Sequence, residues 1–150
     1  MTIRKAGMGD IKSLSELFDD YRIFYQKNPD IEGARFFLSE RIQKKESEIF
    51  ISEGEDRKMF GFVQLYPIFS STRMQRLWLL NDLFVHEQFR GRGISVALIE
   101  YAKMFCKSTD GCGIMLETAK TNEIGNSLYG KTGFQLNTEH HFYYWDKTEM

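Results

Sequence analysis

Apolar residues recur along the first third of the chain with strand-like and then helical spacing. Thr2 to Lys5 predicts a short strand, and Asp10 is a suitable N-cap for the helix that follows. The apolar positions of that helix lie on one side: Ile11, Leu14, Leu17, Phe18, Tyr21 and Tyr25. Asn28-Pro29 interrupts the pattern, and Ala34 to Lys45 predicts a second helix.

The middle of the chain has the pattern of paired strands. Glu48 to Glu53 and Met59 to Tyr66 are strand-like runs separated by a polar turn with a glycine, which predicts a hairpin. Pro67 is expected to end the second run, since proline lacks the amide that a strand ladder uses. After a polar loop, Leu77 to Val85 predicts a long, buried strand.

The last third alternates between helices and strands. Ile94 to Cys106 carries apolar residues at helical spacing. The expected elements after it are a glycine turn at 111–113, a strand at 114–119, a helix at 125–131 ended by Gly133, and strands at 134–136 and 142–146. The predicted order β-α-α-β-β-β-α-β-α-β-β indicates an α/β (α+β) mixed sheet with helices on its faces.

Composition narrows the possible classes of protein. With 150 residues, 42% of them hydrophobic, the chain fits a single domain spanning residues 1–150. A net charge of −1 offers no general attraction for nucleic acid or membranes. The sequence has no run of about 18 apolar residues and no signal-peptide pattern, so we expect a soluble, cytoplasmic protein. Two cysteines and three scattered histidines indicate reduced thiols and no metal site.

A glycine-rich turn joins the long strand to the next helix. The segment Q-F-R-G-R-G at 88–93 lets a ligand approach the unpaired amides at the start of the helix. The amides of residues 90–94 are expected to form a nest for a pyrophosphate, whose charge the helix dipole favours. The alternative is a basic connection whose glycines only make the turn. The dinucleotide-binding spacing G-x-G-x-x-G is absent.

A second motif, N-E-I-G-N-S-L-Y-G-K-T-G-F at 122–134, follows the turn after one strand. The two motifs and the order of elements resemble the GNAT superfamily of acetyl-CoA-dependent N-acetyltransferases over nearly the whole chain. The resemblance implies a mostly antiparallel sheet of six or seven strands, about four helices and a splayed, V-shaped central cleft. It also implies acetyl-CoA as cosubstrate and an enzyme without a metal.

The resemblance assigns the cofactor-binding residues by motif. The turn and helix start would hold the pyrophosphate through Gln88, Arg90, Gly91, Arg92, Gly93, Ile94 and Ser95, although Gln88 is also suited to bracing the loop. The backbone of Leu83, Phe84 and Val85 would pair with pantetheine like an added strand, provided that the strand after it splays away. The later motif contributes Asn122, Asn126, Tyr129 and Lys131. The alternative roles are a helix cap for Asn122 and packing for Tyr129.

Acetyl transfer to an amine needs a proton acceptor, because an alkyl ammonium has a pKa near about 10.4. Asp82 is the first candidate, since burial in an apolar strand would raise its pKa; Glu117, expected on the neighbouring strand, is the second. For either residue the alternatives are a satisfied polar residue or a site for the substrate ammonium, and for Asp82 these weigh as much as the role of base. The resemblance places Tyr129 near the thioester sulfur, where it would protonate the leaving thiolate.

Acids and aromatic residues in the first helix and the adjoining strands suggest a cationic acceptor. The candidate acceptor residues are Asp20, Tyr21, Phe24, Tyr25 and Tyr66. The alternative is that the tyrosines are core and the acids a solvated face. The motifs are similar to the branch that acetylates polyamines and basic protein tails, so a polyamine, small amine or lysine side chain is expected. A different class, a module that binds acetyl-CoA with little turnover, stays open. Aromatic residues from His141 to Trp145 suit a homodimer interface or the core.

Overall fold

The computed structural model describes residues 1–148. The chain divides into two compact units, residues 1–117 and residues 118–150, and each is described by itself. The prediction of a single domain over residues 1–150 stays a prediction.

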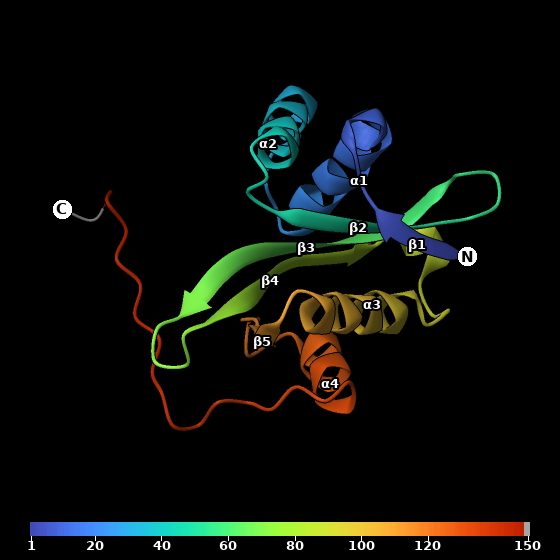
Figure 1. Ribbon diagram of the computed structural model, residues 1–150. Helices are drawn as coiled ribbons and strands as arrows, with labels where there is room; N and C mark the ends of the chain where they lie inside the picture. The colour runs from blue at the N-terminus through green and yellow to red at the C-terminus, as the bar shows by residue number, and fades with distance from the viewer. Residues whose placement is uncertain (149–150) are drawn as a thin grey trace. The chain divides into compact units, whose positions relative to one another are not determined.

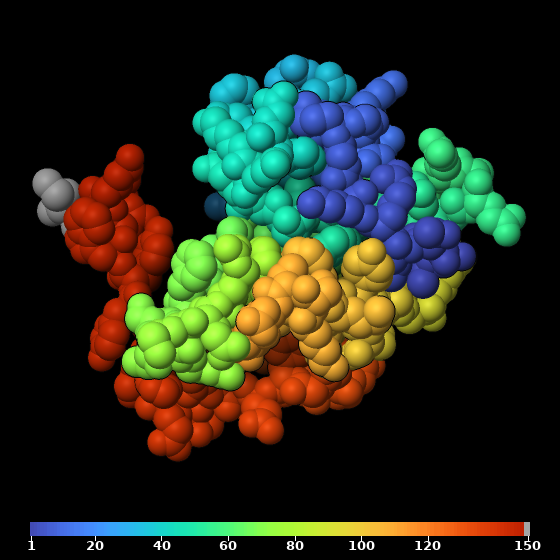
Figure 2. Space-filling view, viewed as in Figure 1, coloured from blue at the N-terminus to red at the C-terminus, as the bar shows by residue number. Residues whose placement is uncertain are grey.

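The first unit is built on one five-stranded sheet in the order β1-β2-β3-β4-β5. The strands are β1 (Thr2–Lys5), β2 (Glu48–Glu53), β3 (Met59–Ser70), β4 (Gln75–Val85) and β5 (Gly111–Met115). Neighbours pair antiparallel except β4 and β5, which are parallel. The turn between β2 and β3 projects from the surface of this unit (Figure 2).

Helices cover both faces of that sheet (Figure 1). Helices α1 (Ile11–Phe24) and α2 (Ile31–Gln43) pack on one face, and α3 (Ile94–Ser108) packs on the other. The core beneath α1 and α2 includes Leu14, Leu38, Ile51 and Phe62, all fully buried. On the opposite face, Phe50 contacts the rings of Tyr101 and Phe105 at 5.0 Å each. Burial on both faces accounts for the three consecutive apolar residues, Ile49, Phe50 and Ile51, at the centre of β2.

A β-bulge in β4 changes which face its side chains occupy. Gln64 pairs with Asp82 but Leu65 pairs with Leu80, which leaves Asn81 as the extra residue. Side chains alternate along a regular strand, so one inserted residue reverses the faces beyond it. Trp78 accordingly packs on Phe105 of α3 at 5.1 Å, whereas Phe84 joins the core beneath α1 and α2. Asp82 lies on the α1 side as a result.

Two strand boundaries differ from the prediction. β3 continues through Pro67 to Ser70 because its pairing with β2 stops at Leu65, so beyond that point the missing proline amide costs no bond on that side. β5 covers residues 111–115, not 114–119. Its glycines belong to the strand: a Cβ at Gly111 would lie 3.2 Å from the Trp78 ring. These glycines let β5 pack closely against Cys106 and Trp78, whereas in the sequence they look like a turn.

Helix starts follow from side-chain capping. Asp30 Oδ1 accepts a hydrogen bond from the amide of Gly33 at 2.9 Å, so α2 begins at Ile31 and not at Ala34. Asp10 precedes α1 but makes no cap hydrogen bond to it. Asp10 ends the short 3₁₀ turn η1 (Met8–Asp10). Its carboxylate accepts a hydrogen bond from the amide of Gly7 at 2.8 Å and forms an ion pair with Arg4 at 2.7 Å.

The second unit contains α4 (Glu123–Lys131), which ends before Gly133 in a left-handed conformation, as expected. The predicted strands at 134–136 and 142–146 are wrong: within residues 132–148 the structure has no strand. A strand pattern becomes a strand only where another edge supplies hydrogen bonds, and here the aromatic side chains of 142–145 are exposed. The described chain therefore has five strands, not six or seven. Across residues 1–148, no helix is long and apolar enough to cross a membrane.

Candidate functional site

The C-terminal half of β4 has one edge without a partner strand in the described chain. Parallel pairing with β5 ends at Leu79 and Met115, while β4 itself continues to Val85. On its other edge β4 stays paired with β3 as far as Gly61 and Val85. Leu83, Phe84 and Val85 thus have a backbone edge with no strand of the described chain beside it, because β5 ends rather than splays away.

The glycine turn that follows is an open nest of amides. Gly91 and Gly93 have φ angles of 79° and 77°, a left-handed conformation that glycine adopts without strain. A Cβ at either position would have no atom within 4 Å, so the space above the turn is free. Through residue 148, no acceptor within the chain is bonded to the amides of Gly91, Arg92 and Gly93. Helix α3 begins directly afterwards at Ile94 and Ser95, and its dipole favours an anion there.

The two arginines of the turn have different positions. Arg90 Nε donates to the carbonyl of Val85 at 2.9 Å, and its guanidinium lies over the rings of Phe24 and Phe84. Its amide donates to Glu87 at 3.4 Å, so Arg90 is not among the open amides of the nest that the sequence predicted. Arg92 is exposed, with its guanidinium 5.4 Å from the Phe89 ring. The guanidinium of Arg92 thus stays in solvent beside the turn, whereas that of Arg90 is bonded to the end of the strand.

Phe89 anchors the turn, a role that sequence reasoning missed. It ends the 3₁₀ turn η2 (Glu87–Phe89), and its ring lies 4.3 Å from that of Phe60 in β3. The available signal was one large apolar residue within an otherwise polar turn. Gln88 has an exposed side chain, and its amide donates to Nδ1 of His86 at 3.2 Å.

Asp82 is a buried carboxylate with three donors. Gln64 Nε2 donates to it at 2.7 Å and Asn81 Nδ2 at 3.2 Å, and the Tyr21 hydroxyl also hydrogen-bonds to it. Burial raises the pKa of Asp82, and the three hydrogen bonds oppose that rise only in part. The group combines a fixed position with a proton affinity above that of an ordinary aspartate, as the sequence predicted.

The second base candidate, Glu117, is not on a strand. It follows the end of β5 at Met115 by two residues, and its side chain is exposed. The expectation of a neighbouring-strand position was wrong because β5 begins and ends earlier than its apolar pattern indicated. Glu117 lacks the burial that distinguishes Asp82.

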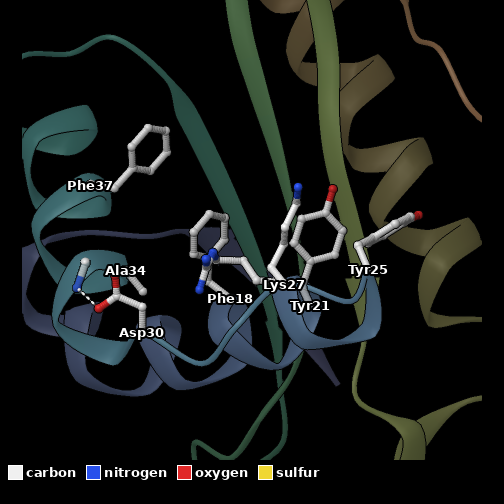
Figure 3. Close-up of a pocket in the computed structure, with 9 residues that line it drawn as sticks. Phe18, Tyr21, Tyr25, Lys27, Asp30, Ala34 and Phe37 are labelled. Atoms are coloured by element: carbon white, nitrogen blue, oxygen red, sulfur yellow. Dashed lines mark hydrogen bonds between the residues drawn. The ribbon is translucent and has the colours of Figure 1, made fainter. Parts of the chain in front are cut away.

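A pocket of about 450 Å³ opens between α1 and α2 (Figure 3). Its walls include the rings of Phe18, Tyr21, Tyr25 and Phe37, together with the charged side chains of Arg22, Lys27 and Asp30. The side chain of Lys27 points the same way as that of Tyr21 (Figure 3). Tyr21 both lines the pocket and hydrogen-bonds to Asp82, so it connects the two.

The other predicted acceptor residues, Asp20, Phe24 and Tyr66, are not among those that line this pocket. Asp20 is exposed on α1, and Phe24 contacts Phe84 at 6.0 Å, close to Arg90. Tyr66 is half-buried in β3; burial and the charge of Asp82 raise its pKa to about 12, against the effect of Arg41. The pocket therefore includes two residues of the predicted set, Tyr21 and Tyr25, and lacks the one acid of that set, Asp20.

The acid beside Asp20 has a structural role. Asp19 is buried, accepts from Arg22 at 2.7 Å, and accepts from the amide of Asp30 at 3.1 Å. Asp19 therefore fixes the link that precedes α2, and it belongs neither to a solvated face nor to a substrate site.

Comparison with known proteins decides the family. The model of the Acetyltransferase (GNAT) family matches residues 12–134. The chain belongs to the GNAT acetyltransferase family. It is 38% identical over 138 residues to "Uncharacterized N-acetyltransferase YhfO" of Bacillus subtilis, covering 92% of each chain. It is 36% identical over 137 residues to a "Probable acetyltransferase" of Haemophilus influenzae, covering 91% of this chain and 92% of that protein.

Solved structures agree with this assignment. A crystal structure described as "a probable acetyltransferase" matches with a TM-score of 0.94 at 33% identity, covering 97% of both chains. The GNAT assignment identifies this chain as an acetyltransferase and accounts for the mixed, mostly antiparallel sheet with four helices.

The second unit of the GNAT chain contains the later motif. Asn122 caps α4 by accepting from Gly125 at 3.0 Å and donates to Thr118 at 2.9 Å, so the alternative role as a cap is present. Asn126 Nδ2 donates to the carbonyls of Ala119 and Asn122, at 3.0 and 2.7 Å. Tyr129 is half-buried, with its ring 5.7 Å from that of Phe134, and Lys131 is exposed. The cofactor and acid roles of these residues stay predictions.

Proposed function

We propose that this GNAT chain transfers the acetyl group of acetyl-CoA to a primary amine by direct attack in a ternary complex. The observation that carries the proposal is continuity: the free edge of β4 leads through η2 directly into the open amide nest of residues 91–93. An extended arm with amide groups followed by a pyrophosphate needs these two features in this order.

The residues at the free edge would orient the pantetheine arm. Backbone groups of Leu83 and Val85 lie where an added strand would pair, and the amide near Phe84 would stabilise negative charge on the carbonyl oxygen. The nest and Arg92 would hold the pyrophosphate. Because Arg90 bonds the Val85 carbonyl, that bond must be released or shared when the arm pairs there.

Acetyl-CoA, when bound, supplies an activated thioester. Asp82 would take the proton of the acceptor ammonium by way of Tyr21, because Asp82 is buried while Tyr21 borders both the carboxylate and the pocket. Tyr129 would return a proton to the departing thiolate, since phenol and thiol pKa values of about 10 and about 8.5 permit the transfer. The amine nitrogen gains the acetyl group and gives up its second proton, which would restore the Tyr129 phenol, and the coenzyme leaves as a neutral thiol.

The pocket between α1 and α2 favours a small amine among the three expected acceptor classes. Its volume of about 450 Å³ suits a small molecule, and four of the nine residues that line it are aromatic. Arg22 is paired with Asp19, but Lys27 forms no ion pair within residues 1–148 and would repel a second positive charge. A polyamine or a basic protein tail fits this wall less well than an amine attached to an apolar group.

Calorimetric titration with acetyl-CoA tests the cofactor part of the proposal. Gly91→Glu should lose binding, because a carboxylate enters the nest beside the pyrophosphate. Gly91→Ala has the same strained φ without the charge and should bind more weakly than wild type but measurably. Gly9→Glu, at another glycine with open space around it, should bind normally. Equal affinities of wild type and Gly91→Glu would contradict the assignment of the nest.

A further inference from the structure

We propose that the amine acetylated by this protein is the α-amino group of a free amino acid with an apolar side chain, whose carboxylate binds to Lys27. This inference rests on the proposed acetyl transfer and goes beyond it by naming the substrate class of the pocket between α1 and α2. Every residue that lines this pocket lies in the first compact unit.

Lys27 carries a charge that no acid of the first unit balances. Three charged side chains line the pocket, and the protein itself engages two of them. Arg22 pairs with Asp19 at 2.7 Å. Asp30 accepts a hydrogen bond from a first-turn amide of α2 at 2.9 Å, which holds its carboxylate at the start of that helix (Figure 3). Within the first unit Lys27 forms no ion pair, so its ammonium is available to an anionic group of a ligand.

The end of α1 fixes the backbone of Lys27. Gln26 has a φ angle of 64°, the left-handed conformation that ends many helices. Its amide donates to the carbonyl of Ile23 at 2.8 Å, and the amide of Lys27 donates to that of Arg22 at 2.9 Å. These two bonds reverse the chain over the last turn of α1. Only the side chain of Lys27 therefore has to be ordered when a ligand binds.

The side chains of Lys27 and Tyr21 both line the pocket and point the same way from the end of α1 (Figure 3). Tyr21 hydrogen-bonds to Asp82, and this pair is the proposed route for the proton of the acceptor ammonium. A ligand that meets both side chains thus has its amine at Tyr21 and its anionic group at Lys27. The α-carbon of an amino acid bears these two groups side by side.

The apolar walls of the pocket select the side chain of that amino acid. The rings of Phe18 and Phe37 are stacked, with centroids 5.9 Å apart and planes 5° from parallel, and Ala34 also lines the pocket. Such walls bind an apolar group because both surfaces leave water. A basic side chain fits worse, since Asp30 is engaged by α2 and Lys27 repels a second cation.

Transfer to an α-ammonium group follows the proposed direct attack. The nitrogen forms an amide bond to the acetyl carbon as the carbon–sulfur bond of the thioester breaks. The ammonium gives up two protons: one passes through Tyr21 to Asp82 and then to solvent, and the other ends on the coenzyme thiol. The product is an N-acetyl amino acid, whose carboxylate is unchanged and keeps its contact with Lys27.

L-phenylalanine and phenethylamine test the inference, because they differ only in the carboxylate. We would measure kcat/KM for both amines at saturating acetyl-CoA. Wild type should favour L-phenylalanine, and Lys27→Met should lower the ratio of the two values roughly fivefold, the factor for one partly exposed charge contact. The two amines differ in pKa, but that difference is the same for both proteins and cancels when their ratios are compared. Lys27→Arg should keep the wild-type ratio, as should Lys44→Met, whose lysine pairs with Glu40 on α2.

An unchanged ratio in Lys27→Met would overturn the inference, as would a wild type that acetylates phenethylamine but not L-phenylalanine. Either result would leave acetyl transfer to an amine intact. A weaker affinity of Lys27→Met for acetyl-CoA in calorimetry would assign Lys27 to the cofactor and overturn the inference equally. No product from either amine would contradict the proposed function itself, and this inference with it.

Discussion

The side-chain amide of Gln64 donates to Asp82 at 2.7 Å across the β3–β4 pair that directly precedes the bulge at Asn81. Gln64 is fully buried, and its Oε1 has no partner within residues 1–148. The bond therefore fixes the carboxylate in one position in a water-poor environment. This relationship makes Asp82 a group whose protonation state changes activity and stability in measurable ways.

The first prediction concerns the pH dependence of turnover. Because the pKa of Asp82 is raised, the acidic limb of kcat/KM should lie above the ordinary aspartate value of 3.8. Gln64→Leu removes a bond to the charged form worth about 1.5–3 kcal/mol. The limb should then move to higher pH by roughly one to two units, at about 1.4 kcal/mol per unit. The exposed Gln43→Leu should leave it in place, and an unmoved limb in Gln64→Leu would remove Asp82 from the role of base.

The second prediction concerns stability. The folded-state pKa of Asp82 lies above its unfolded value near 3.8, so wild type loses stability as pH rises from that value to the folded pKa. Asp82→Asn has no charge to bury. Its unfolding free energy relative to wild type should therefore increase with pH across that window, and urea unfolding at several pH values measures it. Asp20→Asn, at an exposed site, is the control; a pH-independent difference for Asp82→Asn would contradict the burial argument.

Phe89 should affect cofactor affinity without contacting the cofactor. Phe89→Ala removes the ring that anchors η2 on Phe60 and supports Arg92. A looser nest is expected to weaken acetyl-CoA binding by roughly tenfold, because ordering the turn then costs binding free energy. Phe36→Ala removes an exposed ring from α2 and should bind as wild type does. Equal acetyl-CoA affinities of Phe89→Ala and Phe36→Ala would exclude an anchoring role for Phe89.

Tyr129→Phe should separate turnover from binding. Loss of a general acid typically lowers kcat by about 10²-fold or more, whereas binding of the ground state needs no proton transfer. Stopped-flow thiol release would measure kcat, and calorimetry would measure acetyl-CoA affinity. Tyr101→Phe, at a ring packed on Phe50, provides the control. Unchanged turnover in Tyr129→Phe would exclude the acid role.

The pocket predicts a preference between two simple amines. Phenethylamine should have a lower KM than 1,4-diaminobutane, since the pocket offers aromatic walls and an unpaired Lys27. Lys27→Met should narrow that difference by lowering the KM for the diamine, roughly fivefold for one exposed charge contact of about 1 kcal/mol. Lys44→Met, on the exposed end of α2, should not. A preference for the diamine in wild type would restore the polycation as the favoured acceptor.

The glycine turn before α3 could be predicted from sequence because its signals are local. A glycine turn between a buried strand and a helix fixes the φ angles at Gly91 and Gly93 and the start of α3 by short-range sterics alone. The same holds for β2, whose strand-like run and following polar turn predicted its bounds as Glu48–Glu53.

What the sequence did not show depends on distant partners. The bulge at Asn81 is one unpaired residue, and the reversal of side-chain faces that it causes can be seen only once β4 is paired with β3. The glycines of β5 look like a turn until Cys106 and Trp78 are beside them. The pattern at 142–145 favours an extended conformation, but a strand also needs a neighbouring strand edge, which a local pattern cannot show. The pocket between α1 and α2 was hidden for the same reason, since Phe37 and Tyr25 line one cavity only once α2 packs on α1.

Transfer of an isotopically labelled acetyl group most directly tests the central claim. The protein would be incubated with acetyl-CoA labelled in the acetyl carbons and with phenethylamine, and the amine and free coenzyme would be followed by mass spectrometry. We predict labelled N-acetyl amine and free thiol in equal amounts with wild type and neither above background with Gly91→Glu. Labelled amine formed equally by both proteins, or acetyl-CoA binding without product for any amine offered, would contradict the account.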